Sequence, residues 1–259
     1  MSIIKSIFTT IAILVITFAI SYLLIFLNIE YNYSYLVDLA EFLPNLIAYS
    51  LAVWYLYKST NELNKTTDKT SISRVLLFNI FFIAIGLQII DIVFVFWKNI
   101  SNTYFNTSFL LSENHTYESG VTQACKLFNA VIISSFFEEI IFRFYLFGGL
   151  LKRYSFLTAT LISSLMFSII HIGNPRSIIP SFYFGLLSAL VYYKSKNIFY
   201  SILFHFIYNL MWALSLIFAK EYNQLVNYIG FGSGFFIVIL LGIGILFYGT
   251  RQVQKVKSA

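Results

Sequence analysis

The sequence contains little cysteine and little charge. Its one cysteine, Cys125, cannot form an internal disulfide and has none of the spacing that marks zinc or iron–sulfur sites. Only 11% of the residues are charged, against roughly 25% in ordinary soluble domains, so a water-soluble fold is excluded. The net charge is +6, but the basic residues stand in short clusters beside apolar runs, where they more often face lipid headgroups. We therefore expect no nucleic-acid partner.

Long apolar runs take up most of the chain instead. Hydrophobic residues make up 59% of the sequence and aromatic residues 20%, and a helix that crosses a bilayer needs about 20 mostly apolar residues. Runs of this kind lie at residues 7–27, 36–57, 75–97, 127–151, 156–172, 178–193, 198–218 and 229–248. They predict an all-α integral membrane protein, a bundle of about eight transmembrane helices that forms a single polytopic domain over residues 1–259. The fifth and sixth runs are short and could instead form a re-entrant pair, so the range is six to eight.

The basic residues test this topology, because Lys and Arg collect on the cytoplasmic side of membrane proteins. With the N-terminus inside, eight spans place 12 of the 17 basic residues on the cytoplasmic side. These are Lys5, Lys58, Lys65, Lys69, Arg74, Lys152, Arg153, Lys194, Lys196, Arg251, Lys255 and Lys257. The asymmetry favours eight spans with both termini cytoplasmic.

Three ionisable residues stand inside the fourth run, namely Glu138, Glu139 and Arg143. An ionisable group at the centre of a bilayer costs about 2.5–3.5 kcal/mol on insertion scales, so it needs a partner or a function. Glu139 and Arg143 are four residues apart on the expected helix, with the acid first, which favours an ion pair. Glu138 then has no local counter-ion. One interpretation of the three is a purely structural ion cluster.

Polar residues in two later runs favour a catalytic site. His171 ends the fifth run, and His205 and Asn209 lie four residues apart in the seventh, on one face of a helix. A carboxylate in this set can act as a general base on water, while an imidazole orients the water or donates a proton. A second imidazole and a carboxamide can stabilise an oxyanion. The set therefore suits hydrolysis of an amide bond by water.

In three ordered motifs the chain resembles the CPBP family, the CAAX proteases and bacteriocin-processing or immunity proteins of membranes. Glu138, Glu139 and Arg143 match Glu-Glu-x-x-x-Arg. The motif Phe-x-x-x-His is matched by Phe167 and His171, and His-x-x-x-Asn by His205 and Asn209. Between them, Phe184-Gly185-Leu186 resembles a Phe-x-Gly-Leu segment of the family. The resemblance covers about residues 134–209 and places the catalytic core at about 127–218.

The resemblance implies a role for each matched residue. It implies that Glu138 and His171 activate the water, that His205 and Asn209 line the oxyanion site, and that Glu139 and Arg143 support the geometry. Two positions depart from the family pattern: Phe144 stands where many relatives have glycine, and Ser188 or Ala189 holds a later small-residue position. These departures affect helix packing and substrate fit more than catalysis.

A metal-dependent mechanism is the alternative for the same residues. Glu138, His171 and His205 could be two histidines and a carboxylate around zinc. The usual His-Glu-x-x-His helix is absent, and asparagine is a poor fourth zinc ligand. We expect no cofactor, with zinc as the alternative.

Two other functional classes compete with a protease. Intramembrane carboxylates and histidines also mark ion paths, but no inverted repeat is evident, which argues against a transporter. Polar residues near the outer ends of the second and third runs are interpreted as solvated at the membrane interface; they are Asp38, Glu41, Gln88 and Asp91. The main alternative is a non-catalytic bacteriocin-immunity or partner-binding membrane protein.

The expected setting follows from these interpretations. We expect a multi-pass protein of the cell membrane whose partners are the lipid bilayer and a membrane-associated peptide or protein substrate. The many Ile, Phe, Asn, Tyr and Lys residues are associated with AT-rich bacterial genes, which favours a bacterial plasma membrane. The sequence leaves the natural substrate and the oligomeric state open.

Overall fold

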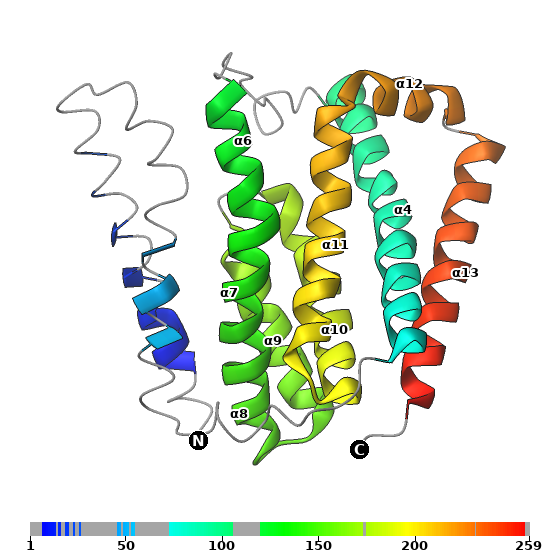
Figure 1. Ribbon diagram of the computed structural model, residues 1–259. Helices are drawn as coiled ribbons and strands as arrows, with labels where there is room; N and C mark the ends of the chain where they lie inside the picture. Colours follow the sequence, from blue (N-terminus) through cyan, green and yellow to red (C-terminus); the bar gives the residue numbers. More distant parts are fainter. Residues whose placement is uncertain are drawn as a thin grey trace.

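The structure is a computed structural model of the whole chain. It describes residues 7–13, 15–16, 19–20, 23, 26, 46–47, 49–51, 53–54, 73–105, 120–172, 175–230 and 232–256. Every regular element in these residues is a helix, and the helices stand side by side as a bundle (Figure 1). The all-α class is therefore confirmed. The predicted spans 7–27 and 36–57 lie only partly within the described residues, so the count of eight stays a prediction.

Three helices in the described part of the chain are long and apolar enough to cross a membrane. The candidate spans are Arg74–Val93 within α4 (Arg74–Phe105), α11 (Ile198–Ile217) and α13 (Ser233–Lys255). They correspond to the predicted runs at 75–97, 198–218 and 229–248. The protein is thus a membrane protein by the length and composition of its helices.

The fourth predicted run lies in one continuous helical stretch. It comprises α6 (Gly120–Phe128), the π-helix η1 (Asn129–Ser134), α7 (Ser135–Glu139), the π-helix η2 (Ile140–Phe147) and α8 (Gly148–Leu151). The capping residues between these pieces all keep right-handed helical dihedrals, so the axis is not broken. A π-turn widens the helix by one residue and is frequently found at functional sites. Here two π-helices flank the Glu138–Glu139 pair.

The fifth and sixth runs form a packed pair of helices, α9 (Phe156–Ile169) and α10 (Pro175–Ser195). The hydroxyl of Ser155 accepts a hydrogen bond from the Thr158 amide and so caps the start of α9. With 14 residues, α9 is about 21 Å long, which is shorter than the roughly 30 Å hydrocarbon core of a bilayer. The short fifth run is therefore a short helix, as the sequence indicated.

A tight turn joins α10 to α11. Lys196 adopts a positive φ of 53°, and the side chain of Asn197 accepts a hydrogen bond from the Phe199 amide at the start of α11. The turn places Lys194 and Lys196 at the same end of the bundle as the α8–α9 turn, the start of α4 and the end of α13 (Figure 1). Basic residues of the described helices thus gather at one end, as the charge asymmetry predicted; its assignment to the cytoplasm stays a prediction.

The chain after α11 differs from the predicted pattern. A separate helix, α12 (Ala219–Ile229), runs across the end of the bundle before α13 begins at Ser233 (Figure 1). The predicted eighth run began at residue 229 and ended at 248, whereas α13 extends to Lys255. The difference arises because α12 is amphipathic: Val226 is buried, while Tyr228 is 90% exposed. Hydropathy alone does not detect such a helix.

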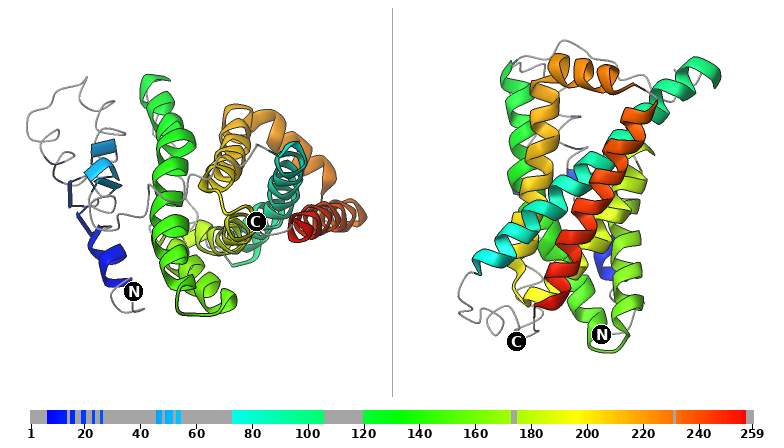
Figure 2. Two further views of the ribbon diagram at one scale, coloured as in Figure 1. Left: turned by 60° about the horizontal axis from the view of Figure 1, so that its bottom comes forward. Right: turned by 90° about the vertical axis from the view of Figure 1, so that its right-hand side faces the viewer.

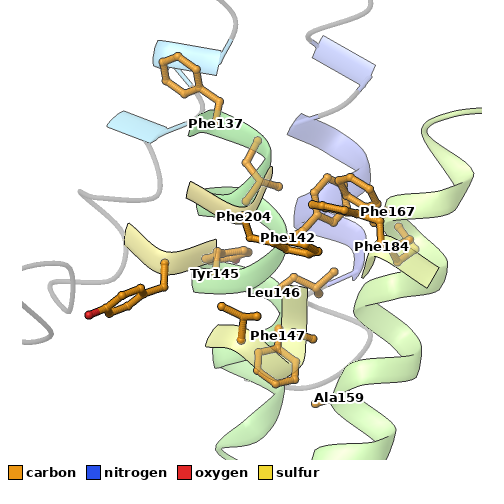
Figure 3. Packing of buried hydrophobic residues seen from close by; sticks show 14 of the residues in the cluster. Phe137, Phe142, Tyr145, Leu146, Phe147, Ala159, Phe167, Phe184 and Phe204 are labelled. Carbon is orange, nitrogen blue, oxygen red and sulfur yellow. The ribbon is translucent and has the colours of Figure 1, made fainter. Parts of the chain in front are cut away.

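Close packing fixes the bundle around the fourth helical stretch. α13 crosses α4 at close range (Figure 2), where a Cβ added to Gly86 would lie 2.6 Å from the Leu246 backbone nitrogen. Small residues permit this kind of approach between membrane helices. Aromatic and aliphatic side chains from η2, α9, α10 and α11 fill the centre, including Phe142, Phe167, Phe184 and Phe204 (Figure 3). This apolar core surrounds the candidate site.

Candidate active site

Glu139 is the centre of a buried polar cluster. Its Oε2 accepts a hydrogen bond from the Ser188 hydroxyl at 2.6 Å and lies 3.3 Å from Nε of Arg143. Its Oε1 lies 3.0 Å from Nδ1 of His205. Glu139 and Arg143 are fully buried, and Ser188 is as well. The cluster therefore joins α7, η2, α10 and α11 through one carboxylate.

The charge of the Arg143 guanidinium is compensated by an ion pair and by aromatic rings. The three guanidinium nitrogens make no hydrogen bond to the described residues, although the ion pair with Glu139 lies within 3.3 Å. The guanidinium carbon stands 4.6 Å from the centre of the Phe167 ring and 5.9 Å from that of Phe184. Aromatic faces attract a desolvated cation. The predicted Glu139–Arg143 ion pair is confirmed, and two phenylalanine rings support it.

The contact with Glu139 fixes the proton on His205. A carboxylate only accepts hydrogen bonds, and Glu139 is already ion-paired with Arg143, so Nδ1 of His205 carries the hydrogen of this bond. Nε2 is then left for other chemistry. In the neutral ring it is an acceptor, and in the imidazolium it is a donor. His205 is only 4% exposed, so its ring lies inside the bundle.

His171, in the turn after α9, is held in a similar way by the end of that helix. Its Nδ1 lies 2.9 Å from the carbonyl oxygen of Phe167, which can only accept, so Nδ1 carries the hydrogen and Nε2 of the neutral ring is an acceptor. The Phe167 ring lies next to both imidazoles, with centroids 5.0 Å from that of His171 and 5.8 Å from that of His205. Phe167 thus connects the two histidines through ring contacts.

Glu138 is buried, with 7% of its surface exposed. Its Oε1 accepts a hydrogen bond from the hydroxyl of Tyr49 at 3.4 Å. Between the described side chains of Glu138 and His171 no hydrogen bond or ion pair is formed. The structure therefore gathers Glu139, Arg143 and His205 in direct contact, and places Glu138 on the adjacent position of α7 with a different partner.

Asn209 makes contacts that the sequence did not indicate. Its Nδ2 donates to the carbonyl oxygen of Ala130 at 2.7 Å and to the hydroxyl of Ser135 at 3.3 Å. Ala130 lies in the π-helix η1, so the amide ties α11 to this irregular stretch. Both N–H groups of the carboxamide are used in these bonds. An oxyanion would have to replace one of them to bind Asn209.

A close contact of α9 and α10 brings Ser188 and Phe184 to the cluster. A Cβ added to Gly185 would lie 2.9 Å from Cβ of Ser164, so only glycine permits this approach. The Phe184 ring in turn packs 4.6 Å from the His205 ring, and Figure 3 shows Phe184 beside Phe167. The segment Phe184-Gly185-Leu186 thereby helps to build the site.

Asp91, near the end of the candidate span within α4, also contacts α11. Asp91, expected to be solvated at the interface, is instead partly buried and accepts a short hydrogen bond from the Tyr208 hydroxyl. The Tyr208 ring packs 5.1 Å from that of Phe184. On α12, burial raises the pKa of the Tyr222 phenol, and the charge of Asp91 adds to the shift. The hydrogen bond between Tyr208 and Asp91 therefore connects α4 to α11, the helix that carries His205.

Several of these contacts join residues far apart in the chain. Tyr49 and Glu138 are separated by 89 positions, and Ser188 and Glu139 by 49. The sequence pattern gave no signal for Tyr49, whereas Ser188 was visible only as a departure from the family pattern. In the part of the chain that the structure describes, no group of three or more His, Cys, Asp or Glu residues is arranged to hold a metal ion. The expectation on cofactors stays a prediction.

Comparison with known proteins identifies the central segment. Residues 120–211 match the family model described as Type II CAAX prenyl endopeptidase Rce1-like. No curated protein and no solved structure matches the chain. The matched segment contains all seven residues that match the three motifs, from Glu138 to Asn209. The match over residues 120–211 therefore supports the CPBP and CAAX protease family that the three motifs predicted.

Proposed function

We propose that this protein is an intramembrane endopeptidase that hydrolyses peptide bonds of membrane-associated peptides or proteins with water. The observation that carries the proposal is the buried Glu139–Arg143–His205 cluster beside Glu138, inside the segment that matches the Rce1-like family. Ionic groups inside an apolar bundle are costly, and they are kept where they serve a function.

Glu138 is the proposed general base. The Glu139 carboxylate already contacts Arg143, Ser188 and His205, whereas the hydrogen bond to Glu138 comes from Tyr49. We therefore assign to Glu138 the role of taking the proton from water. His171 would orient the water, because its Nε2 accepts a hydrogen bond while Nδ1 stays on the Phe167 carbonyl. Both residues come from the family motifs.

His205 is the proposed oxyanion donor. As an imidazolium it donates from Nε2 to the developing negative charge, while Nδ1 remains on Glu139. Asn209 would join His205 after giving up one of its present contacts, of which the 3.3 Å bond to Ser135 is the longer.

The proposed reaction has two steps. Glu138 takes a proton from water, and the hydroxide oxygen bonds to the carbonyl carbon of the substrate, which moves the negative charge to the carbonyl oxygen near His205. The tetrahedral intermediate then collapses: the C–N bond breaks, the carbonyl re-forms, and the amine leaves with the proton held by Glu138. Glu138 returns to its carboxylate form, so the cycle closes without a covalent enzyme intermediate. We propose that no metal takes part.

The setting of the proposed activity is a membrane. The candidate spans and the exposed apolar side chains of α13, such as Leu240 at 67%, fit contact with lipid chains. A substrate held in the bilayer, or tethered to it, reaches a site buried among these helices. We propose that such membrane-associated peptides or proteins are the substrates, in a bacterial plasma membrane.

A cleavage assay tests the proposal. Purified wild-type protein in lipid vesicles is incubated with a library of membrane-anchored peptides and compared with Glu138→Gln, His171→Ala and His205→Ala. Since general acid–base groups typically contribute 10²–10⁴-fold, each variant is expected to lose at least about 100-fold in kcat. Glu221→Gln serves as the matched control, because Glu221 is exposed on α12, away from the cluster.

The opposite result would favour a scaffold that binds a partner without cleaving it. In that case wild-type protein would cleave none of the peptides, and Glu138→Gln would leave the cellular phenotype, such as bacteriocin immunity, unchanged.

A further inference from the structure

Tyr49 reaches the candidate site from a part of the chain far before it. Its hydroxyl donates to Oε1 of Glu138 at 3.4 Å, and its ring stacks on Phe137 with centroids 5.4 Å apart and planes 11° from parallel. Tyr49 is 8% exposed, so the residue is part of the interior. A buried tyrosine keeps a partner for its hydroxyl, and here the partner is the proposed base.

The two adjacent glutamates are held very differently. Glu139 is fixed by Arg143, Ser188 and His205, all within 3.3 Å of its oxygens. Glu138 forms no ion pair with any described residue, and its hydrogen bond comes from Tyr49. A glutamate side chain has three rotatable bonds, so a base that must meet a water molecule in one orientation needs such a partner.

The stack on Phe137 makes Tyr49 suitable for that task. Phe137 is the residue before Glu138 on α7, so one tyrosine contacts two successive positions of the same helix. The ring contact fixes where the hydroxyl points, and Phe137 is itself buried at 9% exposure. The contact is therefore built from packing and hydrogen bonding together.

Tyr49 also lies outside the segment that matches the family model, which begins at residue 120. The neighbouring side chains of Leu46 and Val53 pack against the same hydrophobic core as Tyr49, and Ile13 is buried within it. These described side chains thus lie against the core that contains the matched segment, and Tyr49 contacts Glu138. The family segment by itself does not supply the donor that Glu138 uses here.

We infer that Tyr49 is a positioning residue of the candidate active site, whose hydroxyl holds the Glu138 carboxylate in the orientation needed to activate water. This inference rests on the proposed function for its effect on catalysis. It assigns to Tyr49, a residue before the matched segment, a direct part in completing the site.

The kinetic test uses Tyr49→Phe in the full-length protein in lipid vesicles, with a membrane-anchored peptide that the wild type cleaves. The substitution keeps the ring stack on Phe137 and removes only the hydroxyl. Because hydrogen bonds to charged groups are among the stronger ones, kcat is expected to fall about tenfold while KM changes less than about twofold. The control Tyr228→Phe removes a hydroxyl that is 90% exposed on α12 and should change neither constant. An unchanged or increased kcat in Tyr49→Phe would overturn the inference.

A spectroscopic test works even without turnover. The infrared carboxylate stretch of Glu138 is assigned by its loss in Glu138→Gln, and its frequency is compared between wild type and Tyr49→Phe. A shifted band supports the hydrogen bond from Tyr49, whereas an identical band overturns it. If wild-type protein cleaves no peptide, the proposed function fails, yet the infrared comparison still decides whether Tyr49 holds Glu138.

Discussion

Nδ1 of His205 lies 3.0 Å from Oε1 of Glu139, so a hydrogen bond joins α11 to α7 inside the apolar interior. The other oxygen of the same carboxylate contacts Arg143 and Ser188. Glu139 thus orients the imidazole and compensates the guanidinium at once. A single substitution of this carboxylate should therefore affect both folding and activity.

Glu139→Gln is expected to destabilise the protein strongly. The change keeps the size of the side chain but leaves the buried Arg143 without its ion pair, and breaking a buried pair from one side costs about 3–5 kcal/mol. Unfolding by denaturant in detergent micelles measures the loss, with Glu221→Gln as the exposed control. Equal stability of the two variants would show that Glu139 does not compensate Arg143.

Gly185→Ala should separate α9 from α10. The added Cβ would lie 2.9 Å from Cβ and 3.0 Å from Cα of Ser164, so a helix must move, and overpacking of this kind costs about 1–3 kcal/mol. Activity should fall as well, because α10 carries Ser188 to the cluster. Gly244→Ala is the matched control within α13, where no heavy atom lies within 4 Å of the added Cβ. A loss of thermal stability as large in Gly244→Ala would refute the packing argument.

Tyr208→Phe tests the link between α4 and α11. Removing the hydroxyl deprives the partly buried Asp91 carboxylate of its donor, with an expected loss of about 1–3 kcal/mol in unfolding free energy. The measurement is denaturant unfolding, and Tyr228→Phe, whose side chain is 90% exposed, should match the wild type. If Tyr208→Phe also matches the wild type, Asp91 is solvated as the sequence suggested.

The sequence predicted the local features of the site well. The four-residue spacing of Glu139 and Arg143 indicated an ion pair within one helix, and the structure has it at 3.3 Å. The apolar runs likewise indicated α4, α11 and α13, because hydropathy over about 20 residues is a local property. The family motifs then singled out the histidines and Asn209.

Contacts between helices were not predictable in the same way. Glu139–His205, Tyr49–Glu138 and Asp91–Tyr208 span 66, 89 and 117 residues, and each depends on which faces of two helices meet. Apolar residues surround every face of a membrane helix, so hydropathy does not tell the packed face from the lipid-facing one. The amphipathic α12 was missed for a related reason, since its polar and apolar residues average out.

Removal of metal ions is expected to leave peptide cleavage intact. The proposed chemistry places the base on Glu138 and the oxyanion donor on His205, and neither step uses a metal. Exhaustive chelation of the purified protein followed by the peptide assay measures this, with metal content checked by elemental analysis. Activity that disappears on chelation and returns with zinc alone would replace this mechanism with a metal-dependent one.

In the proposed function, Glu138 activates the water that hydrolyses a peptide bond of a membrane-anchored substrate. The most direct measurement is mass spectrometry of the products formed in ¹⁸O-labelled water by wild type, Glu138→Gln and the control Glu221→Gln. Wild type and Glu221→Gln should release a peptide with label in its new carboxylate, whereas folded Glu138→Gln should release none. Cleavage that persists at the wild-type rate in Glu138→Gln would contradict this role of Glu138.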